Sequence, residues 1–247
     1  MSKKATAIIL TVVFLFSFFP TVVLAENNEP EPQKIIEEGI REVLQLLEDS
    51  PVYTPEDLHR LRPKIQDVIE PLFGFEEITL RTLGRHARAA SEKQLEKIVP
   101  LYRELLENII LNSLTPIVEH SNEPLPIPEV EITGSESRES GAVQYARVFS
   151  TARINPQNDE KRMEVKLNYR LVKREENWIV YDLEIEGVSM VGNYRSQFDD
   201  IITRQSLDGL ISTLEERIRQ FEEDPQKARE EVEDWLPDTD EEQNDQQ

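Results

Sequence analysis

The chain of 247 residues has no cysteine, eight glycines and three histidines. Without cysteine there is no disulfide, thiol nucleophile or thiolate metal site, so the apolar core alone must hold the fold. The glycines form neither a phosphate-binding loop nor a Gly-x-Ser-x-Gly elbow. His59, His86 and His120 fall on separate segments, without the spacing of a zinc-binding helix. We therefore expect no metal, no cofactor and no enzymatic activity.

Basic residues are also scarce, because 28 Lys and Arg oppose 49 Asp and Glu, which gives a formal net charge of −21. Such a chain repels nucleic acid and anionic bilayers, so neither is expected as a direct electrostatic partner. Part of the excess lies in residues 222–247, where twelve acidic residues oppose Lys227 and Arg229. We interpret these residues as an acidic disordered tail.

Long apolar runs are absent after the first 25 residues. Lys3 and Lys4 precede an apolar stretch that reaches Pro20, and Val23 and Ala25 occupy the −3 and −1 positions of a cleavage site. An apolar core of about fifteen residues is too short to span a bilayer, which needs roughly 20. We predict a signal peptide over 1–25, cleaved after Ala25, and export to a bacterial periplasm. A flexible leader (26–33), one domain (34–221) and the tail would follow.

Hydrophobic periodicity predicts six helices and four strands. Capping boxes at Thr54 and Ser91 mark two helix starts, Pro63 should bend or cut one helix, and another should kink at Pro100 and stop before Pro116. The expected helices cover residues 35–47, 55–69, 75–83, 92–114, 194–203 and 207–221, and the expected strands cover 130–132, 143–145, 163–171 and 178–185. Turn-forming stretches over 134–141, 155–161 and 173–177 separate the strands. This order predicts an α+β fold in which helices cover one face of an antiparallel four-stranded sheet.

The stretch over residues 185–198, IEGVSMVGNYRSQF, closely resembles the MlaC family, or toluene tolerance family, of periplasmic phospholipid-binding proteins. Shorter stretches fit the same pattern in order, at residues 69–73, 75–78, 83–86, 102–106, 169–171, 178–182 and 207–210. Each is weak alone, but the ordered set is specific and covers roughly residues 35–214. The leader and the tail lie outside the resemblance.

The resemblance implies a curved sheet and a helical subdomain that enclose an apolar cavity for the acyl chains. It also implies a carrier that moves phospholipid between an outer-membrane lipoprotein complex and an inner-membrane ABC transporter with an MCE-domain ring, maintaining outer-membrane lipid asymmetry. We expect the carrier to be a monomer, although the sequence does not determine its oligomeric state. Phospholipid is then cargo rather than a cofactor. The direction of transport does not follow from the resemblance.

On this interpretation seventeen apolar residues are candidates for the lipid-binding surface. The candidates are Leu72, Phe73, Ile78, Leu83, Leu101, Leu105 and Ile109 from the helices, Val165, Leu167, Tyr169, Val180, Leu183 and Ile185 from the sheet, and Val188, Tyr194, Phe198 and Ile202 beyond it. Arg195, with Arg85, is the candidate for a contact to the head-group phosphate at the cavity rim. A structural salt bridge is the competing interpretation of Arg195.

Two other functions stay open at this point. The first is a carrier for a hopanoid-type lipid, and the second is a periplasmic chaperone or interaction module whose groove holds peptide. The bound molecule distinguishes all three hypotheses. Without the resemblance, the apolar residues would be interpreted as ordinary core.

Overall fold

The computed structural model describes residues 31–119, 123–154, 163–224 and 226–227. The expected signal peptide, most of the expected leader, His120 and the tail from residue 228 lie outside the described residues. The side chains of residues 111–117, 119 and 163 are outside the description as well.

Two amphipathic helices begin the described chain: α2 (Pro32–Asp49) and α3 (Pro55–Ile69). The predicted capping box starts α3, because the Thr54 hydroxyl accepts the Asp57 N–H at 3.3 Å and the Asp57 carboxylate accepts the Thr54 N–H at 3.0 Å. Pro63 lies inside α3 without cutting it. Its side chain is exposed, so water can satisfy the carbonyl that loses its helical donor.

The next three elements are α4 (Phe75–Leu83), the 3-10 helix η1 (Gly84–Ala89) and α5 (Glu92–Glu119). The Ser91 hydroxyl accepts the Gln94 N–H at 3.3 Å, and the Gln94 side chain accepts the Ser91 N–H at 3.0 Å, which confirms the second capping box. The prediction that this helix stops before Pro116 is wrong, since α5 continues to Glu119. Val118, 2% exposed, packs into an apolar cluster with side chains of α3, which holds the last turn.

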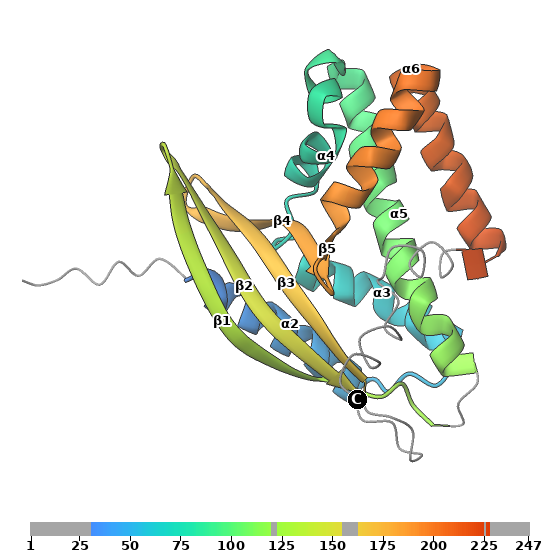
Figure 1. Cartoon of the computed structure of the whole chain (residues 1–247). Coiled ribbons are helices and arrows are strands. Elements are labelled where there is room, and N and C mark those ends of the chain that lie inside the picture. The colour runs from blue at the N-terminus through green and yellow to red at the C-terminus, as the bar shows by residue number, and fades with distance from the viewer. Residues whose placement is uncertain (1–30, 120–122, 155–162, 225, 228–247) are drawn as a thin grey trace, which may run out of the picture. The chain divides into compact units, whose positions relative to one another are not determined.

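The sheet contains β1 (Glu129–Ser140), β2 (Val143–Ile154), β3 (Met163–Arg174), β4 (Asn177–Ile185) and β5 (Val188–Ser189), antiparallel and in that order. Figure 1 shows the long strands curving together. Four strands were predicted, and the fifth has only two residues. The expected turn over 134–141 is wrong, because β1 continues past a bulge at Gly134 and the chain reverses after Ser140, with Gly141 at φ 62°. Pairing with β2 overrides the turn propensity of Gly134 and the serines that follow it.

The last element is α6 (Met190–Glu223), which is broken at Ser206, where φ is 71° and ψ is 178°. Two separate helices, ending at 203 and starting at 207, were predicted, and the break lies between them. Figure 1 shows the two limbs of α6 folding back on one another beside α5. None of the described helices is long and apolar enough to cross a bilayer.

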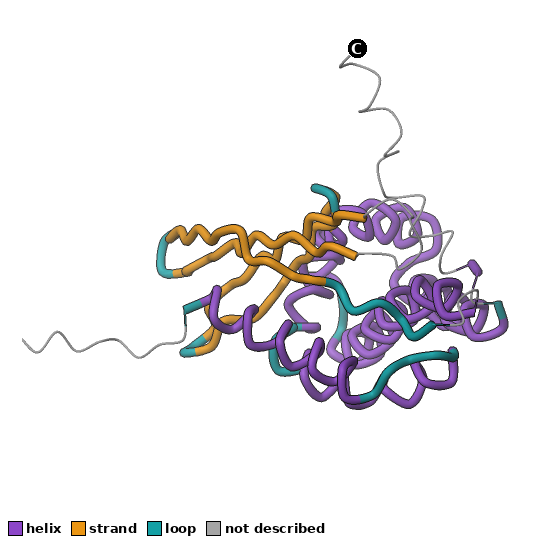
Figure 2. Tube along the Cα trace, turned by 90° about the horizontal axis from the view of Figure 1, so that it is seen from below, coloured by secondary structure: helices purple, strands orange, loops and turns teal. Residues whose placement is uncertain are grey.

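Three apolar clusters hold these elements together. The largest joins α4, α5 and both limbs of α6. In its aromatic centre the middle of the Tyr102 ring lies 5.3 Å from the middle of the Tyr194 ring and 4.9 Å from that of the Phe198 ring, and both pairs meet edge to face. A second cluster joins Ile36 of α2 to the sheet through Val148, Leu171, Trp178 and Val180, among others. The third joins α3 to the end of α5. Figures 1 and 2 show α2 along one face of the sheet, which we call the inner face, and α4, α5 and α6 beyond the β4–β5 edge.

Asp182 of β4 fixes the junction between the sheet and α6. Its side chain, 3% exposed, accepts the Ser189 hydroxyl at 2.6 Å and the Val191 N–H at 3.0 Å. The Arg170 guanidinium lies 3.5 Å away and balances its charge. Because the Ser189 hydroxyl in turn caps α6 by accepting the Gly192 N–H, one buried carboxylate orients β5 and the helix that follows.

The link between α3 and α4 pairs with the same edge of β4 as β5 does, the edge that faces away from β3. The Val180 N–H donates to the Leu72 carbonyl at 2.8 Å, and the Gly74 N–H donates to the Val180 carbonyl at 3.0 Å. Within the described chain, β1 at the opposite edge is paired with β2 alone.

Candidate functional site

The inner-face side chains of β3 are apolar but are covered unevenly. Strand alternation places Val165, Leu167, Tyr169 and Leu171 of β3 on this face. Leu171 is fully buried beneath α2, whereas Val165 and Leu167 are only partly buried. The uncovered part of the face therefore lies toward the start of β3.

Neighbouring strands extend this uncovered part into one patch. Leu167 is registered with Ile185 of β4, and Ile185 is registered with Val188 of β5. All three side chains are partly buried. Val165, Leu167 and Val188 belong to none of the three packed clusters. Ile185 packs against the largest of them, the cluster that joins α4, α5 and α6. We call Val165, Leu167, Ile185 and Val188 the sheet-end patch, and all four were predicted from the sequence.

Most of the predicted lipid-contacting residues of the helices lie elsewhere. They belong to the largest apolar cluster, which joins α4, α5 and α6 and which we call the helical cluster. Its buried members include Ile78, Leu83, Leu105, Ile109, Tyr194, Phe198 and Ile202, and Phe73, Leu101 and Leu183 pack against it. The structure thus brings these ten residues together, with seven of them as mutual packing partners. Contact of any of them with lipid stays a prediction.

The remaining predicted residues of this set lie under α2. Val180 is buried in the cluster between α2 and the sheet, and Tyr169 packs against it. Burial raises the pKa of the Tyr169 phenol, and a hydrogen bond with Ser150 acts in the opposite direction. Leu72 lies against Gly39 of α2, where any side chain would collide with it. The glycine thus allows α2 to approach the link between α3 and α4 closely.

The two arginines predicted at the rim are both exposed, and each is bound to a residue of a neighbouring helix: Arg85 to Asp199 of α6, and Arg195 to Arg81 of α4. Arg85 pairs with Asp199, with 2.8 Å between its Nε and the carboxylate Oδ1, and His86 contacts the same carboxylate oxygen at 2.8 Å. Arg195 Nε donates to the Arg81 carbonyl at 2.9 Å. The salt bridge considered for Arg195 is thus a hydrogen bond to backbone, and a head-group contact for either arginine stays a prediction.

One groove was not predicted. It has a volume of about 250 Å³ and lies between Ile40 and Leu44 of α2 and Val130 and Ile132 of β1, with charged α2 side chains at its rim. The helical spacing of the α2 residues was visible in the sequence, but nothing there indicates which strand they face. The groove is smaller than the roughly 300–1,000 Å³ typical of sites for drug-sized ligands.

A metal centre finds no support in the part of the chain that the structure describes. No three His, Asp or Glu side chains gather there in a way that could hold an ion. His59 is exposed on α3, and His86 is engaged by Asp199.

Comparison with known families and proteins adds an independent finding. The family model described as "MlaC protein" matches residues 37–216. The chain is 22% identical over 214 residues to the "Intermembrane phospholipid transport system binding protein MlaC" of Haemophilus influenzae, which covers 86% of this chain and 92% of that protein.

A solved structure shares the fold. It is the phospholipid-binding protein of Ralstonia solanacearum in complex with a phospholipid, with a TM-score of 0.59 and 22% identity. The match covers 77% of this chain and 98% of that one. The likeness supports the α+β architecture, with its curved antiparallel sheet and helical lobe.

Proposed function

The chain belongs to the MlaC family, and we propose that it is a periplasmic phospholipid carrier, the soluble component of an ABC-type lipid transport system. On this proposal it takes up and delivers phospholipid between the outer and inner membranes and so maintains outer-membrane lipid asymmetry. Its partners would be an outer-membrane lipoprotein complex and an inner-membrane transporter with an MCE-domain ring. The proposal needs no catalytic residue.

The observation that carries this proposal is the family match across almost the whole described fold, together with the sheet-end patch. Incompletely buried apolar side chains are common singly, but in this patch four partly buried ones are adjacent across three strands on the inner face. An acyl chain laid along Leu167 and Ile185 would cover them. The relative from Ralstonia solanacearum is named for phospholipid binding, and the one from Haemophilus influenzae for phospholipid transport.

Physical chemistry explains why such a carrier is required. Moving one CH₂ out of water is worth about 0.8 kcal/mol, so an acyl chain of about sixteen carbons costs on the order of 12 kcal/mol in water. Free phospholipid therefore cannot cross an aqueous compartment at a useful rate. A carrier must supply apolar contacts, and strong interior bonds to the phosphate would only slow release.

The test is to identify what the protein carries. We expect native mass spectrometry of protein isolated from a bacterial periplasm to show a bound mass, and solvent extraction to assign it to diacyl phospholipid. Protein that is empty and takes up no phospholipid from vesicles would contradict the proposal. Bound peptide would indicate the chaperone function instead, and a bound hopanoid would change the cargo.

A further inference from the structure

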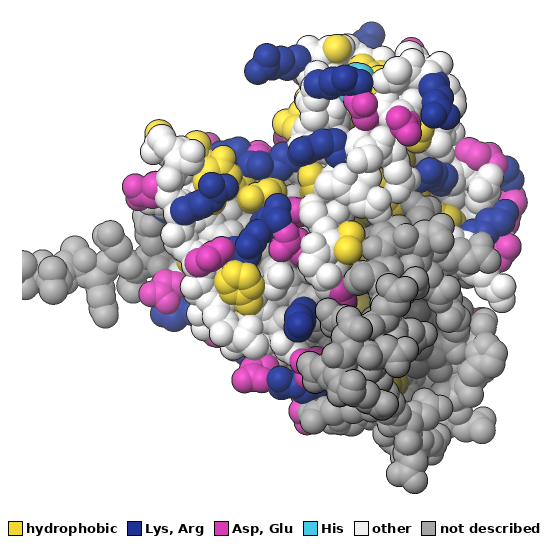
Figure 3. All heavy atoms as spheres, in the orientation of Figure 1, with side chains coloured by type: hydrophobic (Ala, Val, Ile, Leu, Met, Phe, Trp, Pro, Cys, Tyr) yellow, Lys and Arg dark blue, Asp and Glu magenta, His cyan; other side chains and the backbone are white. Residues whose placement is uncertain are grey.

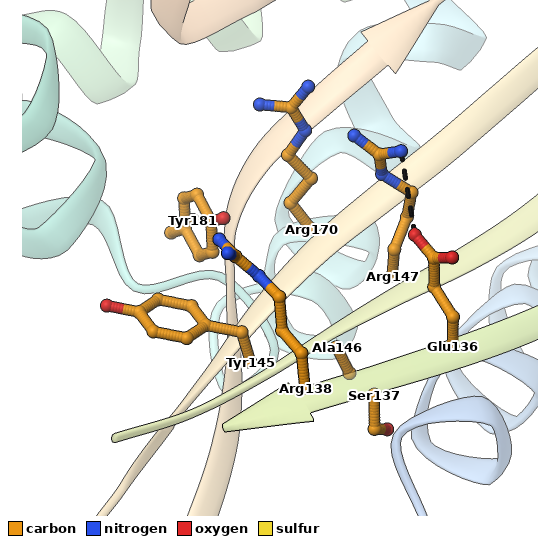
Figure 4. Close-up of a pocket in the computed structure, with 8 residues that line it drawn as sticks. All are labelled: Glu136, Ser137, Arg138, Tyr145, Ala146, Arg147, Arg170 and Tyr181. Atoms are coloured by element: carbon orange, nitrogen blue, oxygen red, sulfur yellow. Dashed lines mark ion pairs between the residues drawn. The ribbon is translucent and has the colours of Figure 1, made fainter. Parts of the chain in front are cut away.

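A second recess, of about 360 Å³, opens on the outer face of the sheet, opposite α2. Its main lining residues are Arg138, Tyr145, Arg147, Arg170 and Tyr181, which come from β1, β2, β3 and β4. Figure 4 shows the three arginine side chains rising from the same side of the sheet, with the two tyrosines beside Arg138. We call this recess the arginine–tyrosine pocket. It shares no residue with the sheet-end patch.

Aromatic rings hold two cations in place at this pocket. The Arg138 guanidinium lies 5.1 Å from the centre of the Tyr145 ring. Arg81, which reaches in from α4, lies 3.9 Å from the centre of the Tyr181 ring, and the two tyrosine rings meet edge to face at 6.2 Å. Arg81 is already paired with Glu77 at 2.7 Å. A cation–π contact orients a guanidinium without neutralising it, so the N–H groups of Arg138 stay available to an anion.

The acidic residues of the sheet neutralise the deeper arginines better than the outer one. Arg170 pairs with the buried Glu184, and Arg147 lies 3.6 Å from both Glu184 and Glu136. Arg138 has no ion-pair partner among the described residues. The pocket lining contains three arginines and one carboxylate, Glu136, in a chain whose formal net charge is −21. Glu184 and Asp182, which lie beneath the lining, offset the charge of Arg170 and part of that of Arg147. Figure 3 shows basic and acidic side chains interspersed on this side of the molecule. For the described part of the chain, the exposed charge without an ion-pair partner at the pocket is therefore the single guanidinium of Arg138.

We propose that the arginine–tyrosine pocket docks an acidic segment of a partner protein, whose carboxylates pair with Arg138 and Arg147. Guanidinium groups bind planar carboxylates through two parallel hydrogen bonds, and the tyrosine rings supply flat apolar contact for the segment's backbone and side chains. An anionic bilayer is a poorer occupant, because the acidic chain as a whole is repelled by an extended anionic surface.

The same charge distribution would fix the orientation of docking. An acidic partner is repelled by most of this chain and attracted at the pocket, so encounters in other orientations are disfavoured. Attraction between partly exposed charges also weakens steeply with salt and gives fast, reversible binding. Such docking suits a protein that must leave its partner again, whatever its cargo.

The test measures binding of a fluorescein-labelled hexaglutamate peptide to the full chain by fluorescence anisotropy at low salt. Arg138→Glu is the main variant, because Arg138 is exposed and its replacement leaves the packed clusters intact. Lys97→Glu is the matched control, since it makes the same change in net charge at an exposed α5 side chain outside the pocket. Arg147→Gln is a second pocket variant, and thermal melting checks the folding of all three.

We expect Arg138→Glu to weaken peptide binding by about tenfold or more, as loss of a charge-assisted pair does. Lys97→Glu should change it less than about twofold, and Arg147→Gln should give an intermediate loss. Equal losses in Arg138→Glu and Lys97→Glu would overturn the proposal, as would no binding by the wild-type chain. Binding to phosphatidylglycerol vesicles that depends on Arg138, without binding to the peptide, would also overturn it and indicate a membrane surface.

The outcome is separable from that for lipid carriage. Arg138→Glu should retain the same bound lipid as the wild-type chain, because the pocket and the sheet-end patch lie on opposite faces of the sheet. If the protein carries no lipid but binds the peptide through Arg138, the carrier function fails and the docking site stands.

Discussion

A tryptophan at Leu167 tests the sheet-end patch most directly. Leu167 lies at the centre of the patch, registered with Ile185, and its side chain is only partly buried. The larger indole ring would occupy the space that an acyl chain needs above β3. Lys166→Trp is the matched control, because Lys166, which directly precedes Leu167 on the same strand, points to the outer face and is exposed.

The expected loss follows from the apolar contact displaced. If the ring excludes about four methylenes of the acyl chain, at about 0.8 kcal/mol each, binding weakens by about 3 kcal/mol, or roughly 200-fold in Kd. Unfolding should change by less than about 1 kcal/mol, because Leu167 lies outside the packed clusters. Lys166→Trp should leave both quantities near the wild-type values.

The assay is transfer of a fluorescent phospholipid from vesicles to protein, with the lipid content of the purified protein as a second readout. Urea denaturation of the same samples separates loss of binding from loss of folding. Equal lipid content in Leu167→Trp and Lys166→Trp, with both proteins folded, would refute the assignment of lipid to the inner face.

Three further predictions concern stability. Asp182→Asn should lower the free energy of unfolding by about 3 kcal/mol in urea denaturation, because it removes the buried charge that pairs with Arg170 and weakens the junction at Ser189; a change below about 0.5 kcal/mol would contradict this role. Ser206→Gly should raise the free energy of unfolding by about 1 kcal/mol, since relief of an unfavourable backbone conformation outweighs the entropy cost of glycine, and a lower melting temperature would argue against strain. Hydrogen bonds from the Tyr53 N–H, then from Arg60 and Thr54, lower the pKa of Asp57, so its contribution to stability is present above roughly pH 4 and is lost as the pH falls through the lowered pKa. Acid titration of Asp57→Asn, followed by circular dichroism, should show a smaller loss of stability below pH 4 than the wild-type chain shows.

Local signals in the sequence were sufficient for the order of the elements. Capping at Thr54 and Ser91 and the alternation in β3 are properties of a few neighbouring residues, and the structure confirms them. The length of β1 was not predictable in this way. Residues 134–140 contain three serines and one glycine, and they form a strand only because β2 supplies hydrogen-bond partners for their backbone.

The candidate site, too, was predictable only where a local pattern of residues identifies it. Alternation identified Leu167 as an inner-face residue, but an apolar residue in a helix has the same periodicity whether it fills a core or lines a cavity. Leu105 was predicted as a lipid contact, and only three-dimensional packing shows that it is fully buried among helices. The arginine–tyrosine pocket was missed because its lining residues come from four strands, and only the register of the sheet brings them together.

The unequal edges of the sheet bear on solubility. An edge strand of twelve residues, paired on one side only, is a template on which a second molecule could add its own strand, the first step toward aggregation. At β4 the Leu72 and Gly74 backbone occupies that position. At β1 the side chains of Glu129, Glu131, Glu136 and Glu139 are exposed, and Arg153 and Arg147 pair with two of them. Charged side chains along an edge strand disfavour its pairing with the same edge of a second molecule.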